Sequence, residues 1–305
     1  METAPSSFFE DVPDGHQSGY VAIVGKPNVG KSTLLNAMLG EKLSIVTRKP
    51  QTTRHRVIGI HSGSDHQVIF LDTPGIISPR YSLHETMMGQ VKGAIRDADL
   101  LLFLHEATQE EPDTESLEHI GDTPAFLVLT KMDLISQDHA IPLVESYTEM
   151  RAFDEVVPTS ALTGHNVDTL VDLVVESLPE GPPFYPKEMI SEHPERFFVA
   201  EIIREKAFQH YHQELPYSIQ VNIVSYEERE GNQKDYIDAE IVVMSESHKG
   251  IVIGEGGRAL KKVGTEARTD IEAFVQSPVY LNLHVKVQED WRDREQILRS
   301  YGYRS

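Results

Sequence analysis

Closely spaced glycines, a lysine and a serine near the start of the chain have the spacing of a phosphate-binding loop. The run comprises Gly25, Lys26, Pro27, Asn28, Val29, Gly30, Lys31 and Ser32, followed by Thr33. Glycines permit a tight turn whose backbone N–H groups point at phosphate oxygens, and the helix that follows adds a favourable partial charge. Lys31 can reach the β- and γ-phosphates, and the Ser32 hydroxyl can bind Mg²⁺. The run therefore predicts a nucleotide-phosphate site, with a plain glycine loop between strand and helix as the alternative.

A second motif ends an apolar, strand-like run. Its residues are Asp72, Thr73, Pro74 and Gly75. An aspartate at this place can hold a water molecule on Mg²⁺, and the Gly75 N–H can contact a γ-phosphate. Alone the motif is weak, because Asp, Pro and Gly are ordinary turn residues. Its distance from the phosphate loop and its place at a strand end make it informative.

Two further motifs concern the base. The first comprises Thr130, Lys131, Met132 and Asp133, and the second Ser160, Ala161 and Leu162. A carboxylate at Asp133 can accept two hydrogen bonds from guanine, which adenine cannot donate, and such paired bonds discriminate by roughly 10⁴-fold. The Lys131 stem can lie along the base. The Ser160 motif could contact guanine O6 through backbone N–H groups, so together the motifs predict a guanine-nucleotide site.

The elements that must position these residues alternate between strands and helices. We expect a helix at 32–39 and strands at 20–24, 57–61, 67–72, 99–105, 125–130 and 155–158. This alternation predicts an α/β fold with a mostly parallel sheet, helices on both faces and one antiparallel edge. We expect residues 1–18 to be a disordered tail that is neither a secretory signal nor a transit peptide, and 19–178 to be the nucleotide-binding domain.

A proline-rich segment, 179–186, separates this pattern from a different one. It holds four prolines in eight residues, which predicts a semi-rigid linker. The domain at 187–305 is expected to be α+β. Its predicted helices are 195–212, 258–274 and 291–301, and its predicted strands are 218–228, 236–245 and 279–288.

The motifs, together with Gln51–Arg54, resemble in order and spacing the GTPases of the Era family. The resemblance implies GTP hydrolysis with Mg²⁺ held by Ser32, Asp72 (through water) and Thr53, the last on a mobile switch. The switch comprises Gln51, Thr52, Thr53, Arg54 and His55. Thr52 is the adjacent alternative to Thr53 as the metal-binding residue. The guanine motif departs from the family's commoner pattern, because Thr130 stands where Asn is usual. We expect somewhat lower affinity from the lost amide.

The residue after Gly75 bears on the rate of hydrolysis. Many GTPases carry a glutamine there that orients the attacking water, whereas this chain has Ile76 and Ile77, as is normal in the family resembled. Intrinsic turnover is therefore expected to be slow or assisted. In related GTPases an Asn at the position of Asn28 helps to hold K⁺ beside the phosphates; the alternative is a loop residue that tolerates the left-handed conformation.

A glycine-rich loop in the second domain resembles the Gly-x-x-Gly loop of a type II KH domain. The residues concerned are Ile253, Gly254, Glu255, Gly256, Gly257, Arg258, Lys261 and Lys262. Such a loop lets a single-stranded RNA backbone approach closely, and the alternative is a tight turn between helices. By resemblance, the domain would bind the 3′ end of 16S rRNA, and the protein would assist maturation of the 30S ribosomal subunit. The basic window 249–268 predicts salt-sensitive binding.

Composition limits the remaining classes. The chain has 305 residues, no cysteine and a net charge of −20, which suits a cytoplasmic protein and argues against a generally basic nucleic-acid binder. We expect a monomer, and peripheral membrane contact stays open because it needs no distinctive sequence. A passive RNA-binding module is the competing reading. A tRNA-modifying GTPase shares the hydrophobic position 76 but carries a carboxy-terminal catalytic cysteine. The single phosphate loop excludes a tandem GTPase, and the lack of apolar spans excludes a membrane iron transporter.

Overall fold

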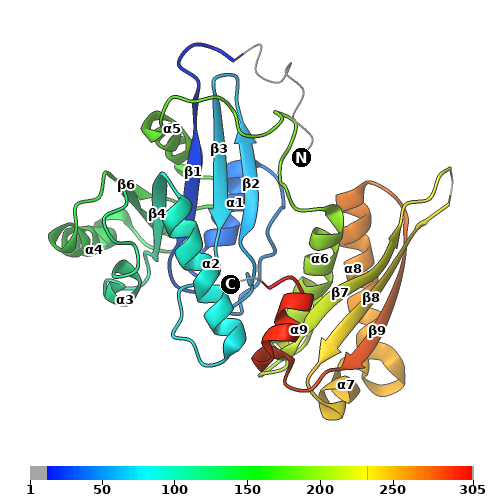
Figure 1. The fold of residues 1–305 in the computed structure, drawn as a ribbon. Helices are drawn as coiled ribbons and strands as arrows, with labels where there is room; N and C mark the ends of the chain where they lie inside the picture. Colours follow the sequence, from blue (N-terminus) through cyan, green and yellow to red (C-terminus); the bar gives the residue numbers. More distant parts are fainter. Residues whose placement is uncertain (1–11, 232, 304–305) are drawn as a thin grey trace. The chain divides into compact units, whose positions relative to one another are not determined.

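The computed structural model describes residues 12–231 and 233–303, which form two compact units (Figure 1). The first unit comprises the chain up to Ser44 together with Thr53–Ser78 and Met87–Glu192. The second comprises Ile45–Thr52, Pro79–Thr86 and the chain from His193 onward.

A six-stranded sheet forms the centre of the first unit, in the order β2-β3-β1-β4-β5-β6. Its strands are β1 (Gln17–Val24), β2 (Val57–Ser62), β3 (His66–Asp72), β4 (Leu100–Glu106), β5 (Ala125–Thr130) and β6 (Glu155–Pro158). Only β2 is antiparallel to its neighbour in the described sheet. The carboxyl ends of the five parallel strands therefore lie along one edge, where the motif residues follow them.

Helices cover both faces of this sheet, which confirms the predicted α/β class. Apolar residues of α1 (Lys31–Leu39) and α5 (Val167–Ser177) pack in one core, in which Leu34 and Leu170 are buried together with Val21 of β1. Those of α2 (Ser82–Asp97) and α4 (Gln137–Met150) pack in the other. A single turn, α3 (Thr114–Leu117), precedes β5. Buried strands contribute alternate residues to each core, as continuous apolar runs in parallel sheets do.

The predicted tail and linker are partly wrong. Residues 1–11 of the tail lie outside the described residues, but β1 begins at Gln17 rather than at residue 20. Ser18 is buried, and its N–H donates to Pro179 O at 3.0 Å. The side-chain oxygen of Gln67 accepts from the N–H groups of Phe184 and Tyr185. The proline-rich segment therefore runs along the first unit, because its free carbonyls and N–H groups find partners there.

The second unit contains a three-stranded sheet of β7 (Gln220–Glu227), β8 (Asp235–Val243) and β9 (Val279–Val287). The β7–β8 pair is antiparallel and the β8–β9 pair is parallel. Apolar residues of α6 (Glu195–His210) and α8 (Arg258–Val275) pack with the sheet in one core. This α+β order confirms the predicted type II KH arrangement.

Two helices of this unit differ from expectation. The segment Glu246–Ile253 is an additional helix, α7, although its last residues are β-branched and favour strands. Ser245 caps it by accepting the His248 N–H at 3.2 Å, so β8 ends at Val243. The predicted last helix is a 3₁₀ turn at Trp291–Asp293 followed by α9 (Glu295–Ser300). Other 3₁₀ turns occur at Met132–Leu134, Pro216–Ser218 and Glu255–Gly257.

The segment Ile45–Thr52 belongs to the second unit although it precedes the switch threonine. Arg204 of α6, which is 1% exposed, donates to Thr52 O at 2.5 Å. Lys49 Nζ donates to the carbonyls of Phe208 and Tyr211 at the end of the same helix. A cation at a helix carboxyl end is well placed to satisfy its last carbonyls.

Candidate functional site

The phosphate loop joins β1 to α1 as the sequence predicts. Gly25 has φ 143°, and a Cβ there would lie 2.5 Å from Leu104 O. Gly30, which caps α1, has φ 104°. Asn28 also lies in the left-handed region, at φ 66°, as the alternative of a loop residue that tolerates this conformation predicts. Glycine is required at both ends of the loop for conformation and, at Gly25, for close approach.

Lys31 lies inside this loop with 6% of its surface exposed. Its Nζ donates to Gly25 O at 3.0 Å and to Lys26 O at 2.8 Å. Burial lowers the pKa of Lys31 to about 8, although the charges of Asp72 and Asp113 act in the opposite direction. The lysine thus satisfies carbonyls of its own loop, in the position from which phosphate oxygens can replace them.

Three predicted Mg²⁺ residues converge at the start of α1. Ser32 Oγ lies 2.7 Å from Asp72 Oδ2 and 2.8 Å from Thr53 Oγ1. Asp72 is fully buried, which raises the pKa of its carboxyl, and its Oδ1 has no hydrogen-bond partner among the described residues. Two hydroxyls and a carboxylate are hard oxygen donors, and an unpartnered buried carboxylate oxygen suits a cation or its water, so the residues fit Mg²⁺. The neighbouring Thr52 hydroxyl instead contacts Thr47 and Lys49 O.

The Asp72–Gly75 motif packs directly on the phosphate loop. Thr73 Oγ1 donates to Ile23 O at 2.7 Å, which anchors the motif to β1. A Cβ on Gly75 would lie 2.6 Å from Pro27 N. Ile76 is 4% exposed and belongs to the core, and its N–H donates to Gly25 O at 3.1 Å. Its side chain therefore offers no group that could orient a water molecule.

The guanine motif lies at the end of β5, beside the same loop. Thr130 Oγ1 donates to Val29 O at 2.5 Å, so the hydroxyl that replaces the usual amide still joins this motif to the phosphate loop. Ser160 Oγ donates to Asp133 Oδ1 at 2.6 Å, which orients the exposed carboxylate. Leu162 is 82% exposed and makes up the outer end of the third motif.

Two acids outside the four motifs contact lysines of this site. Glu106 Oε2 lies 2.6 Å from Lys131 Nζ, and Asp113 Oδ1 lies 2.8 Å from Lys26 Nζ. Both flank the loop between β4 and α3. The signal available in the sequence is that Glu106 ends a buried strand at the same edge of the sheet as the motifs.

The glycine loop of the second unit joins α7 to α8. Gly254, Gly256 and Gly257 all have positive φ, at 69°, 59° and 75°. A Cβ on Gly254 would lie 2.7 Å from the Cβ of Ala259, so the loop turns closely onto α8. Arg258, Lys261 and Lys262 lie in the first turns of that helix, where both lysines are exposed. Backbone N–H groups and cations at a helix start can bind a phosphate chain.

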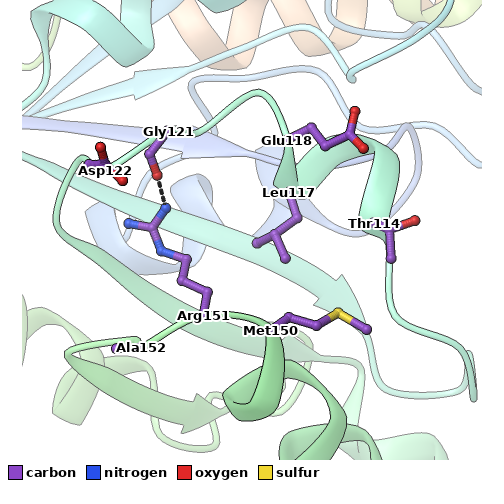
Figure 2. A pocket seen from close by; sticks show the side chains of 8 residues that line it. All are labelled: Thr114, Leu117, Glu118, Gly121, Asp122, Met150, Arg151 and Ala152. Carbon is purple, nitrogen blue, oxygen red and sulfur yellow. Dashed lines mark hydrogen bonds between the residues drawn. The ribbon is translucent and has the colours of Figure 1, made fainter.

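A separate cavity of about 650 Å³ lies in the first unit away from these motifs (Figure 2). Its lining includes Leu117, Glu118, Asp122 and Met150. Arg151 crosses its wall and donates to Gly121 O. None of its lining residues belongs to a nucleotide motif, so the cavity is distinct from the candidate site.

The helices in the described part of the chain include none with the length and apolar character of a membrane span.

Comparisons with known proteins agree with this geometry. A family model described as 50S ribosome-binding GTPase matches residues 20–131, and one described as KH domain matches residues 214–292. The chain is 50% identical to GTPase ERA1, chloroplastic, of Zea mays, covering 94% of this chain and 71% of that protein. It is 44% identical to GTPase Era of Clostridium botulinum, covering 94% and 99%.

Solved structures show the same two-part fold. The structure of a single-substitution variant of Aquifex aeolicus Era bound to GDP·AlF₄⁻ has a TM-score of 0.91 and 41% identity, covering 95% of this chain and 100% of that one. A structure of Era with MgGDPNP and nucleotides 1506–1542 of 16S ribosomal RNA has the same TM-score, identity and coverage. Because these likenesses span nearly the whole chain, the protein belongs to the Era family of GTPases.

Proposed function

We propose that this protein is a GTP-hydrolysing switch that binds the 3′ end of 16S rRNA through its KH domain and assists 30S subunit assembly. The observation that carries the switch is the convergence of Ser32, Thr53 and Asp72 at one point. The RNA half is supported by the Gly254–Gly257 loop and by the relative solved with nucleotides 1506–1542 of 16S rRNA.

In the nucleotide site, each residue has a role that its position supports. Lys31 and the loop N–H groups bind the phosphates, and Asp133, oriented by Ser160, accepts from guanine. Ser32 and Thr53 would hold Mg²⁺ and Asp72 would hold one of its waters. When bound there, Mg²⁺ would supply neutralisation of phosphate charge. Thr53 would contribute its hydroxyl only while the γ-phosphate is present, so its segment would report the nucleotide state.

The segment before Thr53 supports a link to the KH domain. Thr53 belongs to the first unit, whereas Thr52 belongs to the second and its carbonyl accepts from Arg204. A change in the order of Thr53 would therefore act on Thr52, the preceding residue, whose carbonyl accepts from Arg204 of α6. The full chain should bind RNA in one nucleotide state more tightly than in the other.

An RNA-binding experiment tests the switch. Anisotropy of a labelled 16S 3′-end RNA is measured with the full chain, Mg²⁺ and either GDPNP or GDP. Lys261→Gln/Lys262→Gln should weaken binding at least five-fold and flatten its salt dependence, whereas Lys92→Gln/Lys286→Gln, an equal charge change elsewhere, should not. Equal affinity in both nucleotide states would refute the switch. Equal loss in both variants would refute binding at the glycine loop.

We propose further that K⁺ assists hydrolysis through Asn28, because Ile76 is buried and supplies no group for the water. Asn28 lies within the phosphate loop and is exposed there. Turnover should be faster in K⁺ than in Na⁺, and Asn28→Ala should remove the difference. Equal wild-type rates in the two salts would contradict the proposal.

The expected cytoplasmic monomer is a proposal as well. Light scattering of the full chain at micromolar concentration measures its mass against the 34.3 kDa of one chain. Co-sedimentation with anionic vesicles tests the peripheral membrane contact that the sequence leaves open. Binding that persists at high salt would support that contact, since exposed charges are then screened.

A further inference from the structure

The last residue of β4 and the loop from it to α3, residues 106–113, run beside both halves of the nucleotide site. At its start, the Ala107 N–H donates to Thr130 O at 2.9 Å. Just before it, Leu104 O lies where a side chain on Gly25 would be. Neither contact involves an acidic side chain, so backbone groups bring the start of this loop to the phosphate and base motifs.

Glu106, at the start of the loop, uses both carboxylate oxygens. Oε2 pairs with Lys131 Nζ at 2.6 Å, and Oε1 accepts from Thr108 Oγ1 at 2.6 Å. Burial alone would raise the pKa of Glu106, but these two contacts hold it below its ordinary value. Lys131 has φ 60°, an uncommon conformation for a lysine. The carboxylate therefore fixes the end of a side chain whose stem is expected to lie along the base.

Asp113, at the end of the loop, is 2% exposed. Its Oδ1 accepts from Lys26 Nζ at 2.8 Å and from the Ser116 N–H at 3.1 Å. Its own N–H donates to the hydroxyl of Tyr147, which is fully buried. Its Oδ2 has no hydrogen-bond partner among the described residues. A buried carboxylate with one unpartnered oxygen depends on its cation, so Lys26 and the opening turn of the phosphate loop are held to a rigid part of the core.

We propose that Glu106 and Asp113 are positioning residues of the GTPase site, each holding the lysine of one nucleotide motif. Glu106 holds Lys131 against the base, and Asp113 holds Lys26 and with it the turn that contains Asn28. The inference rests on the nucleotide site proposed above. It differs from that proposal because it concerns residues outside all four motifs.

The two acids should have different kinetic signatures. Guanine is common to GTP and GDP, so Glu106→Gln should raise KM for GTP and Kd for GDP by the same factor, about three- to five-fold, and leave kcat unchanged. The amide oxygen still accepts from Thr108, whereas the amide NH₂ cannot accept from Lys131, so the charge and the lysine's acceptor are lost together. Asp113→Asn keeps an oxygen for the Ser116 N–H but removes the charge that holds Lys26, and it should lower kcat about three- to ten-fold with a smaller change in KM.

The experiment measures steady-state GTP hydrolysis, GDP affinity and melting temperature for each variant. Glu110→Gln and Glu111→Gln are the matched controls, because both acids are exposed on the same loop and no motif lysine pairs with them in the described part of the chain. Both should match the wild type. Lys26→Met breaks the Lys26–Asp113 ion pair by changing the half-exposed lysine, and it leaves the buried acid unaltered. It should lower kcat as Asp113→Asn does, and the double variant should be no worse than either single one.

The results separate this inference from the GTPase itself. Wild-type protein that fails to hydrolyse GTP would refute the proposed function. Active wild-type protein with Glu106→Gln and Asp113→Asn indistinguishable from the Glu110 and Glu111 controls would refute the positioning role alone. So would losses in kcat that are additive in the Lys26→Met/Asp113→Asn double variant. A fall in melting temperature with kcat and KM unchanged would also refute it, because the acids would then be structural only.

Discussion

Replacing Gly75 by alanine should disable hydrolysis by a purely steric route. The added Cβ would lie 2.6 Å from Pro27 N and 2.7 Å from Pro27 Cα, both backbone atoms of the phosphate loop. The φ of Gly75 lies outside the left-handed range, so the backbone itself tolerates alanine. Relief of the contact to an ordinary van der Waals distance requires the two loops to separate by about 0.8 Å. A misplacement of about 1 Å in a catalytic site can cost roughly 10²-fold in rate.

We therefore expect Gly75→Ala to lower kcat/KM for GTP about 10²-fold. GDP affinity should fall by a smaller factor, because GDP lacks the γ-phosphate that the Gly75 N–H would contact. Single-turnover hydrolysis and GDP titration measure the two quantities. Gly93→Ala is the control, because that glycine lies within α2 with nothing within 4 Å of the added Cβ. It should leave activity unchanged and stabilise the helix by about 0.5–1 kcal/mol. Gly75→Ala with turnover within about three-fold of the wild type would refute the close packing of the Asp72–Gly75 motif on the phosphate loop.

Three other predictions concern stability. Burial lowers the pKa of His105, whose Nδ1 accepts from Tyr147 Oη at 2.8 Å. As pH falls, the unfolded chain takes up the proton first, so stability is full above about pH 6.5 and should fall below it; His105→Gln should flatten this part of a melting profile. Thr130→Val removes the hydroxyl that donates to Val29 O and should cost about 1–2 kcal/mol in urea denaturation, whereas Thr130→Ser should cost less. Tyr303→Phe removes a buried donor 2.7 Å from Gln220 Oε1 and should cost about 1–2 kcal/mol; the fluorescence of the only tryptophan, Trp291, reports the unfolding of its own unit.

The nucleotide motifs were the part of the site that the sequence could predict. Strand ends in a parallel sheet share an edge, so residues 25–32, 72–75 and 130–133 had to meet there. The choice between Thr52 and Thr53 was left to resemblance, and the structure brings the Thr53 hydroxyl to Ser32. Local spacing was sufficient because each motif is a short loop fixed by its own strand.

Other features depended on contacts that spacing does not encode. The helix α7 ends in Ile251, Val252 and Ile253, whose β-branched side chains favour strands, but the Ser245 cap and burial of Val252 in the core prevail. Asp113 meets Lys26 across many intervening residues, and nothing in its neighbourhood marks it among the exposed acids nearby. Long-range pairing of single side chains therefore leaves no local pattern in the sequence from which it could be predicted.

The motifs of this site are tied together mainly through backbone groups. Gly25 O accepts from the Ile76 N–H, and Thr130 O accepts from the Ala107 N–H. Backbone hydrogen bonds do not depend on residue type, so threonine at position 130 keeps the bond made by its carbonyl. Its hydroxyl adds a bond to Val29 O. Side-chain identity matters where a charge or a missing Cβ is required, as at Lys31, Asp72 and Gly75. By that criterion Glu106 and Asp113 belong with the site, because each supplies a charge that no backbone group of their loop can replace.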